Sequence, residues 1–164
     1  MDNKGFDEML ATNGPMLVRI AASYEMQPAA REDLLQDITL ALWRALPQWR
    51  RDASVRSFVA RIAHNRCVNH IVAQKRHRHE VAIDEAVIDH SADPHRDAVN
   101  HQRYERLQHA LRRLPLGHRQ AITLALEGFS HVEIADALSV KVNTVDARIS
   151  RARRTLHDYL EERT

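Results

Sequence analysis

Residues 130–154, with the sequence SHVEIADALSVKVNTVDARISRARR, predict two short helices that meet at a tight corner. Ser130 and Glu133 have the S-x-x-E spacing of a capping box, so the first helix should begin just after Ser130 and end near Leu138. Residues 139–141 form the predicted corner, and a second helix is expected from Val142 to about Glu161. Apolar side chains at helical spacing are present on both helices to close a small core between them. The pattern is typical of a helix-turn-helix unit.

The second of these helices carries polar and cationic side chains suited to DNA. Its arginines can neutralise phosphates, and Asn143 or Ser150 can reach the edge of a base in a groove. An amphipathic hairpin whose basic face is only solvated is the alternative, because many helical hairpins have this pattern. Taken alone, the segment leaves both interpretations open.

The composition favours an all-α protein. The chain has 164 residues, only four glycines and 5% aromatic residues, so helix formers outweigh strand formers. Cys67 is the single cysteine, which excludes an internal disulfide and a cysteine-based zinc cluster and fits a reducing cytoplasm. We expect Cys67 to be a small, partly buried residue rather than a reactive thiol. The chain has no run of about 18 apolar residues, so no membrane contact is expected.

Helical spacing also marks the rest of the chain. Residues 6–24 predict either two short helices or one kinked helix, because the pattern is interrupted at residues 13–15. Another helix is predicted over residues 30–46, ended by Pro47, and a third from an N-cap at Ser54 to about Lys75. The pattern returns at about Ala98, breaks at Pro115, and resumes to Gly128, which suits a helix C-cap.

Charge divides the chain into three parts. Residues 53–79 contain six Arg or Lys and no Asp or Glu, an electrostatic footprint for a nucleic-acid strand unless it is an ordinary solvated face. Residues 80–97 are predominantly acidic and lack sustained helical spacing, which favours a linker. The predicted organisation is therefore a domain over residues 1–79, a linker over 80–97 and a second domain over 98–164.

In this order the elements resemble the extracytoplasmic-function (ECF) sigma factors of the sigma-70 family. The resemblance is carried by DLLQDITLALWRALPQWRRDASVRSFVARIAHNRCVNHI, residues 33–71, for region 2 and by LRRLPLGHRQAITLALEGFSHVEIADALSVKVNTVDARISRARRTL, residues 111–156, for region 4. It implies two small helical domains, a region 2 bundle and a region 4 helix-turn-helix, joined by the acidic linker. The implied function is promoter recognition and transcription initiation. The implied partners are core RNA polymerase, promoter DNA and an anti-sigma factor.

The resemblance also assigns roles to individual residues. The polymerase-binding positions are Asp33, Gln36 and Asp37. The positions that contact the melted downstream promoter element are Arg56, Arg61, Asn65, Arg66 and Asn69, with Asn65 where the family often reads a flipped base. The positions that contact the upstream element are Asn143, Thr144, Asp146, Arg148, Arg151 and Arg153, the three arginines being assigned to the DNA backbone.

Several positions depart from the family pattern or need a separate interpretation. Asp146 stands where a cation is usual, and a carboxylate accepts only from an exposed amine such as that of cytosine, so it either changes specificity or weakens upstream binding. Ala125 stands where relatives often have a DNA-contacting arginine. Trp43, Trp49 and Phe58 are expected to pack in the core rather than to stack on DNA.

The sequence does not favour an enzyme. His64, His70, His77 and His79 lack neighbouring ligands of other types, so a metal site is not expected, and no glycine-rich phosphate loop is present. No cofactor is predicted, and catalysis would belong to the polymerase. The alternatives to a sigma factor are a stand-alone helix-turn-helix regulator and a sigma-like interaction module with reduced promoter reading.

Overall fold

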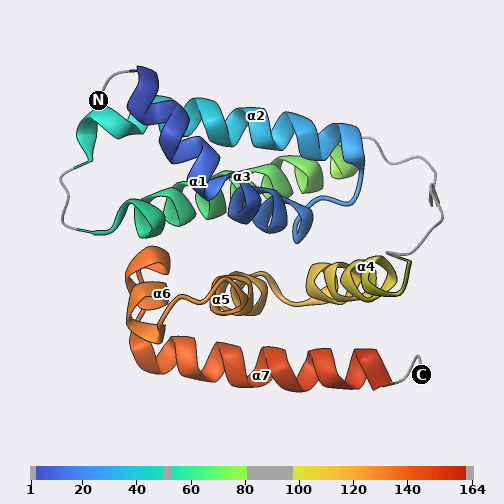
Figure 1. Cartoon of the computed structure of the whole chain (residues 1–164). Coiled ribbons are helices and arrows are strands. Elements are labelled where there is room, and N and C mark those ends of the chain that lie inside the picture. Colours follow the sequence, from blue (N-terminus) through green and yellow to red (C-terminus); the bar gives the residue numbers. More distant parts are fainter. Residues whose placement is uncertain (1–2, 50–52, 81–97, 162–164) are drawn as a thin grey trace.

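The computed structural model describes residues 3–49, 53–80 and 98–161, and these are helical, as predicted. The order of the elements is α1 (Asn3–Ala22), α2 (Pro28–Ala45), the 3-10 turn η1 (Leu46–Gln48), α3 (Val55–Glu80), α4 (Ala98–Arg113), α5 (Leu116–Leu126), α6 (His131–Leu138) and α7 (Val142–Glu161). Helices α1–α3 form one layer, and helices α4–α7 form a second layer beneath it (Figure 1). None of the described helices is both long and apolar enough to cross a membrane.

Helix α1 decides between the two alternatives for residues 6–24. It is one helix with Pro15 inside it, and Figure 1 shows that it changes direction along its length. A proline removes one backbone donor and clashes with the preceding turn, which bends a helix without necessarily ending it. Just before the proline, Asn13 Nδ2 donates to the Met9 carbonyl (2.9 Å).

Local signals set the ends of α2 and α3. Pro28 occupies the first turn of α2, where its missing N–H has no partner to lose, and Pro47 falls in η1, just beyond the end of α2. The Ser54 hydroxyl accepts from the Ser57 amide (3.1 Å), which confirms the N-cap. Helix α3 runs five residues past the predicted end at Lys75, and it therefore takes in Glu80, the first residue assigned to the linker. Residues 81–97, the rest of that linker, lie outside the described residues.

The corner between α6 and α7 has the predicted capping. Both hydrogen bonds of the Ser130–Glu133 capping box are formed, at 3.2 and 2.7 Å. Ser139 ends α6 in the left-handed region at φ 54°, a conformation that a non-glycine residue adopts at some cost. Gly128 has φ 83° just after α5, as its assignment to a helix C-terminus requires.

One apolar core extends through both layers. Its most buried large side chains come from α1, α2 and α3 above and from α4, α5, α6 and α7 below; they include Ile20, Leu34, Ile38, Leu42, Val59, Leu111, Leu124, Ile134, Val145 and Ile149. Helices α5 and α6 both contact α3. The two layers are therefore packed against each other, with α3 at the boundary.

Candidate nucleic-acid interface

An acidic face lies on the outer side of α2. Asp33, Gln36 and Asp37 are all exposed, while Leu34 and Ile38 on the same helix point into the core. Spacings of three and four residues put the three polar side chains on one face. The acidic face is thus available to a partner, as its assignment to polymerase binding requires.

The aromatic residues of the first layer differ in burial. Phe58 is buried, and Trp49 is partly buried beside it with ring centroids 6.1 Å apart, so both pack in the core as expected. The expectation for Trp43 was wrong, because this residue is 45% exposed, although its ring contacts Phe6 edge to face, with centroids 4.9 Å apart. Trp43 lies near the C-terminal end of α2.

Helix α3 exposes a stripe of polar side chains. Arg61, Asn65 and Asn69 are exposed and recur every four residues, so they form one row along the helix. Arg66 is exposed next to this row, about 100° further round the helix from Asn65. The structure therefore brings together four of the five residues assigned to the downstream element.

Arg56 is set apart from that stripe. It lies five residues before Arg61, which turns it by about 140° around α3 toward the second layer. Its guanidinium donates to the Glu127 carbonyl and lies over the Phe129 ring, 4.5 Å from the centroid. The assignment of Arg56 to the downstream element thus conflicts with its position in this arrangement, where the second layer engages it.

The same region holds an ion pair between the layers. Arg19 donates through two nitrogens to the Glu127 carboxylate, at 2.7 and 2.8 Å, and this hydrogen bonding raises the pKa of Arg19. The Glu127 side chain is 8% exposed and the Arg19 side chain 46% exposed. Further along the boundary, Arg112 donates to the Ala22 carbonyl at 2.8 Å. Glu127 and these arginines were not singled out from the sequence, because nothing local indicates that α1 and α5 meet.

The buried side of α3 contains two titratable groups that are inert at neutral pH. His64 is hydrogen-bonded to the Tyr24 hydroxyl through Nδ1 (2.9 Å), and burial lowers its pKa to about 4. Burial raises the pKa of the Cys67 thiol to about 12, and Cys67 is fully buried rather than partly buried as expected. A neutral imidazole and a protonated thiol both fit an apolar interior.

His70 has a structural partner as well. Burial alone raises the pKa of Glu25, but hydrogen bonds from His70 (2.7 Å), the Gln27 amide (2.8 Å) and Gln74 outweigh it, and the pKa is lowered. The pair ties the α1–α2 connection to α3. Among the described residues no three metal-binding side chains gather at one point.

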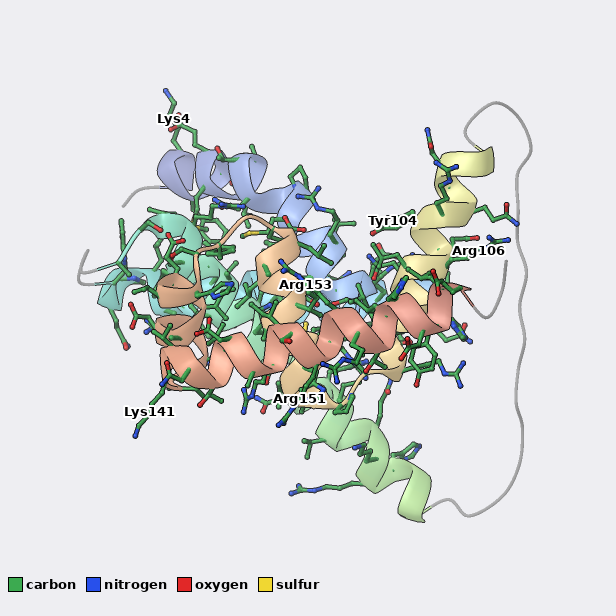
Figure 2. All side chains as sticks on the ribbon, turned by 90° about the horizontal axis from the view of Figure 1, so that it is seen from below. Lys4, Tyr104, Arg106, Lys141, Arg151 and Arg153 are labelled. Carbon is green, nitrogen blue, oxygen red and sulfur yellow. The ribbon has the colours of Figure 1, made fainter. Side chains whose placement is uncertain are left out.

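Helix α7 divides the residues assigned to the upstream element into two groups. The helix buries Val145, Ile149, Ala152 and Leu156 and exposes the opposite side. Figure 2 shows Arg151 and Arg153 projecting on opposite sides of the helix. By helical spacing, Thr144 and Arg148 lie on the side of Arg151, whereas Asn143 and Asp146 lie nearer that of Arg153.

Two residues at positions considered for DNA contact are instead partly buried in the second layer. Arg148 is half-buried and packs over Gly117 at the start of α5, where an added Cβ would lie 3.1 Å from the guanidinium carbon. Ala125 is partly buried against the core. Asp146, in contrast, is exposed and bonded to His131, the first residue of α6, which sequence reasoning did not include in the site.

Comparison with known proteins shows to which family the chain belongs. Residues 9–77 match the family described as Sigma-70 region 2, and residues 104–156 match Sigma-70, region 4. Two solved structures share the arrangement of the described helices. The sigma factor RpoE in complex with the anti-sigma factor NepR from Bartonella quintana has a TM-score of 0.78 at 25% identity, covering 96% of this chain and 98% of that one. CnrH in complex with the cytosolic domain of CnrY has a TM-score of 0.72 at 26% identity, covering 99% and 92%.

The chain therefore belongs to the sigma-70 family of transcription initiation factors. Curated relatives narrow the class. The ECF RNA polymerase sigma factor SigM of Mycobacterium tuberculosis is 30% identical over 94% of this chain and 76% of its own length. The RNA polymerase sigma factor NccH of Alcaligenes xylosoxydans xylosoxydans is 28% identical over 98% of this chain and 89% of its own length. The protein is an ECF sigma factor, which directs promoter recognition and transcription initiation.

Proposed function

We propose that the protein works as two domains, residues 1–79 and 98–164, with residues 80–97 as the linker between them. The separate family matches to residues 9–77 and 104–156 support this division. An acidic linker suits polymerase channels that are cationic because they accept nucleic acid. The first domain grips polymerase and melts DNA, and the second docks on the upstream element. Nucleotide chemistry belongs to the polymerase, and the setting is the cytoplasm.

The acidic face of α2 is the proposed docking surface for core RNA polymerase. Its support is that Asp33, Gln36 and Asp37 are exposed on one side of a well-buried helix. The exposed Leu40 and Trp43 continue this face and add apolar contact area. The double variant Asp33→Lys/Asp37→Lys should lose assembly with core polymerase. The double variant Asp7→Lys/Glu8→Lys, an equal change of charge at exposed positions of α1, should retain it.

The stripe Arg61, Asn65 and Asn69, together with Arg66, is the proposed surface for the melted downstream strand. Asn65 sits in the middle of the stripe, flanked by cations for the phosphates. Asn65→Ala should reduce open-complex formation more than it reduces polymerase binding. Equal loss of both would show that Asn65 has no separate role in reading a base. Arg56 joins this surface only when the two layers separate.

Helix α7 is the proposed reader of the upstream element in the major groove. Arg148, Arg151 and Arg153 are assigned to the DNA backbone, and Asn143 and Thr144 to base edges. The proposal is supported by the exposure of Asn143, Arg151 and Arg153 on α7, whereas Thr144 and Arg148 are half-buried.

An anti-sigma factor is the proposed regulator. The two solved structures named above are sigma factors bound to anti-sigma factors, and their arrangement extends over nearly the whole of this chain. Because Arg56 is engaged between the layers, the closed arrangement is the one that a regulator of this kind would hold.

The decisive test combines the protein with core RNA polymerase and a duplex promoter library. Its basis is the presence in one chain of an acidic face on α2 and two basic helices, α3 and α7. Specific transcripts are expected only when the protein is present. Tight duplex binding without polymerase and no initiation would favour a stand-alone regulator. Polymerase binding without initiation would favour an interaction module.

A further inference from the structure

The contact between His131 and Asp146 joins the two helices of the helix-turn-helix. His131 Nδ1 lies 2.5 Å from Asp146 Oδ1, and the side chains are 45% and 50% exposed. His131 is the first residue of α6, directly after the N-cap Ser130, so the capping box fixes its backbone. The backbone position of His131 is thus well defined, and both side chains of the pair remain accessible at the surface.

Hydrogen-bond chemistry determines what the pair can offer. An ionised carboxylate only accepts, so the hydrogen in this bond belongs to His131 Nδ1. Asp146 Oδ1 is then occupied, and the second carboxylate oxygen keeps its acceptor sites. A carboxylate that already has a donor is held in one orientation, and its repulsion by DNA phosphates is reduced.

The surroundings of Asp146 on α7 suit contact with bases. Asn143, Asp146, Ala147 and Ser150 are exposed at spacings of three, four and seven residues, so they form one stripe. Between Asn143 and Ser150 the stripe contains no lysine or arginine, and the exposed Arg153 and Arg154 continue it in the next turn. Alanine and serine leave room for a base edge to approach, and a free carboxylate oxygen accepts from the N4 amine of cytosine, the pairing open to Asp in the major groove.

We propose that His131 and Asp146 act together as a specificity-determining pair, in which His131 orients Asp146 and Asp146 accepts a hydrogen bond from a cytosine of the upstream element. The inference rests on the proposed function, since it requires α7 in the major groove. It resolves the two outcomes open for Asp146 in favour of altered specificity. The competing interpretation is an exposed ion pair that only braces α6 on α7 and contributes little.

The test uses holoenzyme containing the full chain and a promoter whose upstream element is randomised. Transcripts made by the wild-type protein should show a preference for cytosine at one position of roughly tenfold. Asp146→Ala should remove that preference, and Asp146→Asn should shift it toward adenine, which an amide can contact through two hydrogen bonds. His131→Ala should weaken the preference, and His131→Gln, which restores a donor, should recover part of it.

His157→Ala is the matched control. His157 is an exposed histidine of α7 that also pairs with an acid, Glu161 at 3.5 Å, but it lies about two turns beyond Ser150. It should leave the base preference unchanged. If Asp146→Ala keeps the wild-type preference while transcripts are still made, the pair is only a brace and the inference is wrong. If the wild-type holoenzyme makes no specific transcripts, the proposed function itself fails.

Discussion

Helices α3 and α7 are both assigned to DNA, but the rest of the chain surrounds them differently. α3 contacts α1 and α2 in its own layer and α5 and α6 in the other, so between Arg61 and Asn69 only part of its circumference is exposed, whereas its last turns, from Val72, are largely exposed. α7 packs by one side and presents a broad face to solvent. The difference fits the two tasks, because a single strand needs one row of contacts whereas a major groove receives a whole helix face.

The comparison extends to charge. Arg56, Arg151 and Arg153 are all exposed, but Arg56, the first cation of α3, is also bonded to the second layer. With the two layers packed together, α7 is therefore free to contact DNA, whereas one residue of the DNA surface proposed for α3 is bonded to the second layer. Variants that affect α3 or α7 one at a time test this contrast.

The largest effect on stability is expected from shortening a buried side chain of α7. Ile149 is 2% exposed, so Ile149→Ala should lower the free energy of unfolding by about 3 kcal/mol through lost burial and a residual cavity. Urea unfolding followed by circular dichroism measures this change. Val142→Ala, at an exposed position of the same helix, should cost less than about 1 kcal/mol. Similar losses for the two variants would show that α7 does not depend on one packed side.

The next effect concerns the buried histidine of α3. An unfolded chain protonates His64 near pH 6.5, whereas the folded protein does so only at about 4. The unfolded state therefore binds more protons between these values, and stability should fall as the pH decreases through this window, by at most about 3 kcal/mol. His64→Gln should flatten this part of the profile, measured as unfolding free energy against pH. The exposed His157→Gln on α7 should keep the wild-type slope, and a wild-type slope in both variants would contradict the burial of His64.

A smaller effect is expected at the boundary between the layers. Glu127→Ala removes the acceptor of Arg19, and because Arg19 is nearly half exposed, the loss in unfolding free energy should be no more than about 1 kcal/mol. Small-angle scattering should show a larger radius of gyration if the layers separate more often. Glu161→Ala, which breaks an exposed pair within α7, should change neither quantity. An unchanged radius for Glu127→Ala would mean that the other contacts across the boundary hold the layers together without this ion pair.

The sequence predicted those features that local chemistry determines. The Ser130–Glu133 spacing, Pro47, Ser54 and Gly128 marked helix ends correctly, because a cap or a proline acts within one turn. The resemblance likewise assigned Asp37 and Asn65 to binding surfaces, and both side chains are exposed. These features need no knowledge of what lies across the core.

Contacts between distant elements were not predictable in this way. Trp43 was expected in the core and is exposed, because the periodicity of α2 does not reveal how far the neighbouring helices extend. The engagement of Arg56 depends on α5 and α6 reaching α3, and the pairing of His131 with Asp146 depends on the angle at the corner. Both follow from packing between segments that the sequence separates.

The smallest effect is expected from Arg56→Lys, which keeps the charge and changes the shape. An ammonium cannot reproduce a planar guanidinium that donates to the Glu127 carbonyl while it lies over Phe129, so the contact between the layers should weaken by about 0.5 kcal/mol. A double-mutant cycle with Phe129→Leu measures this coupling. Binding of single-stranded promoter DNA by the free protein, in which the two layers are packed together, should be unchanged, because Arg56 is engaged by the second layer. If Arg56→Lys instead weakens that binding as much as Arg61→Ala does, Arg56 belongs to the DNA surface, and the contrast between a partly engaged α3 and an open α7 is wrong.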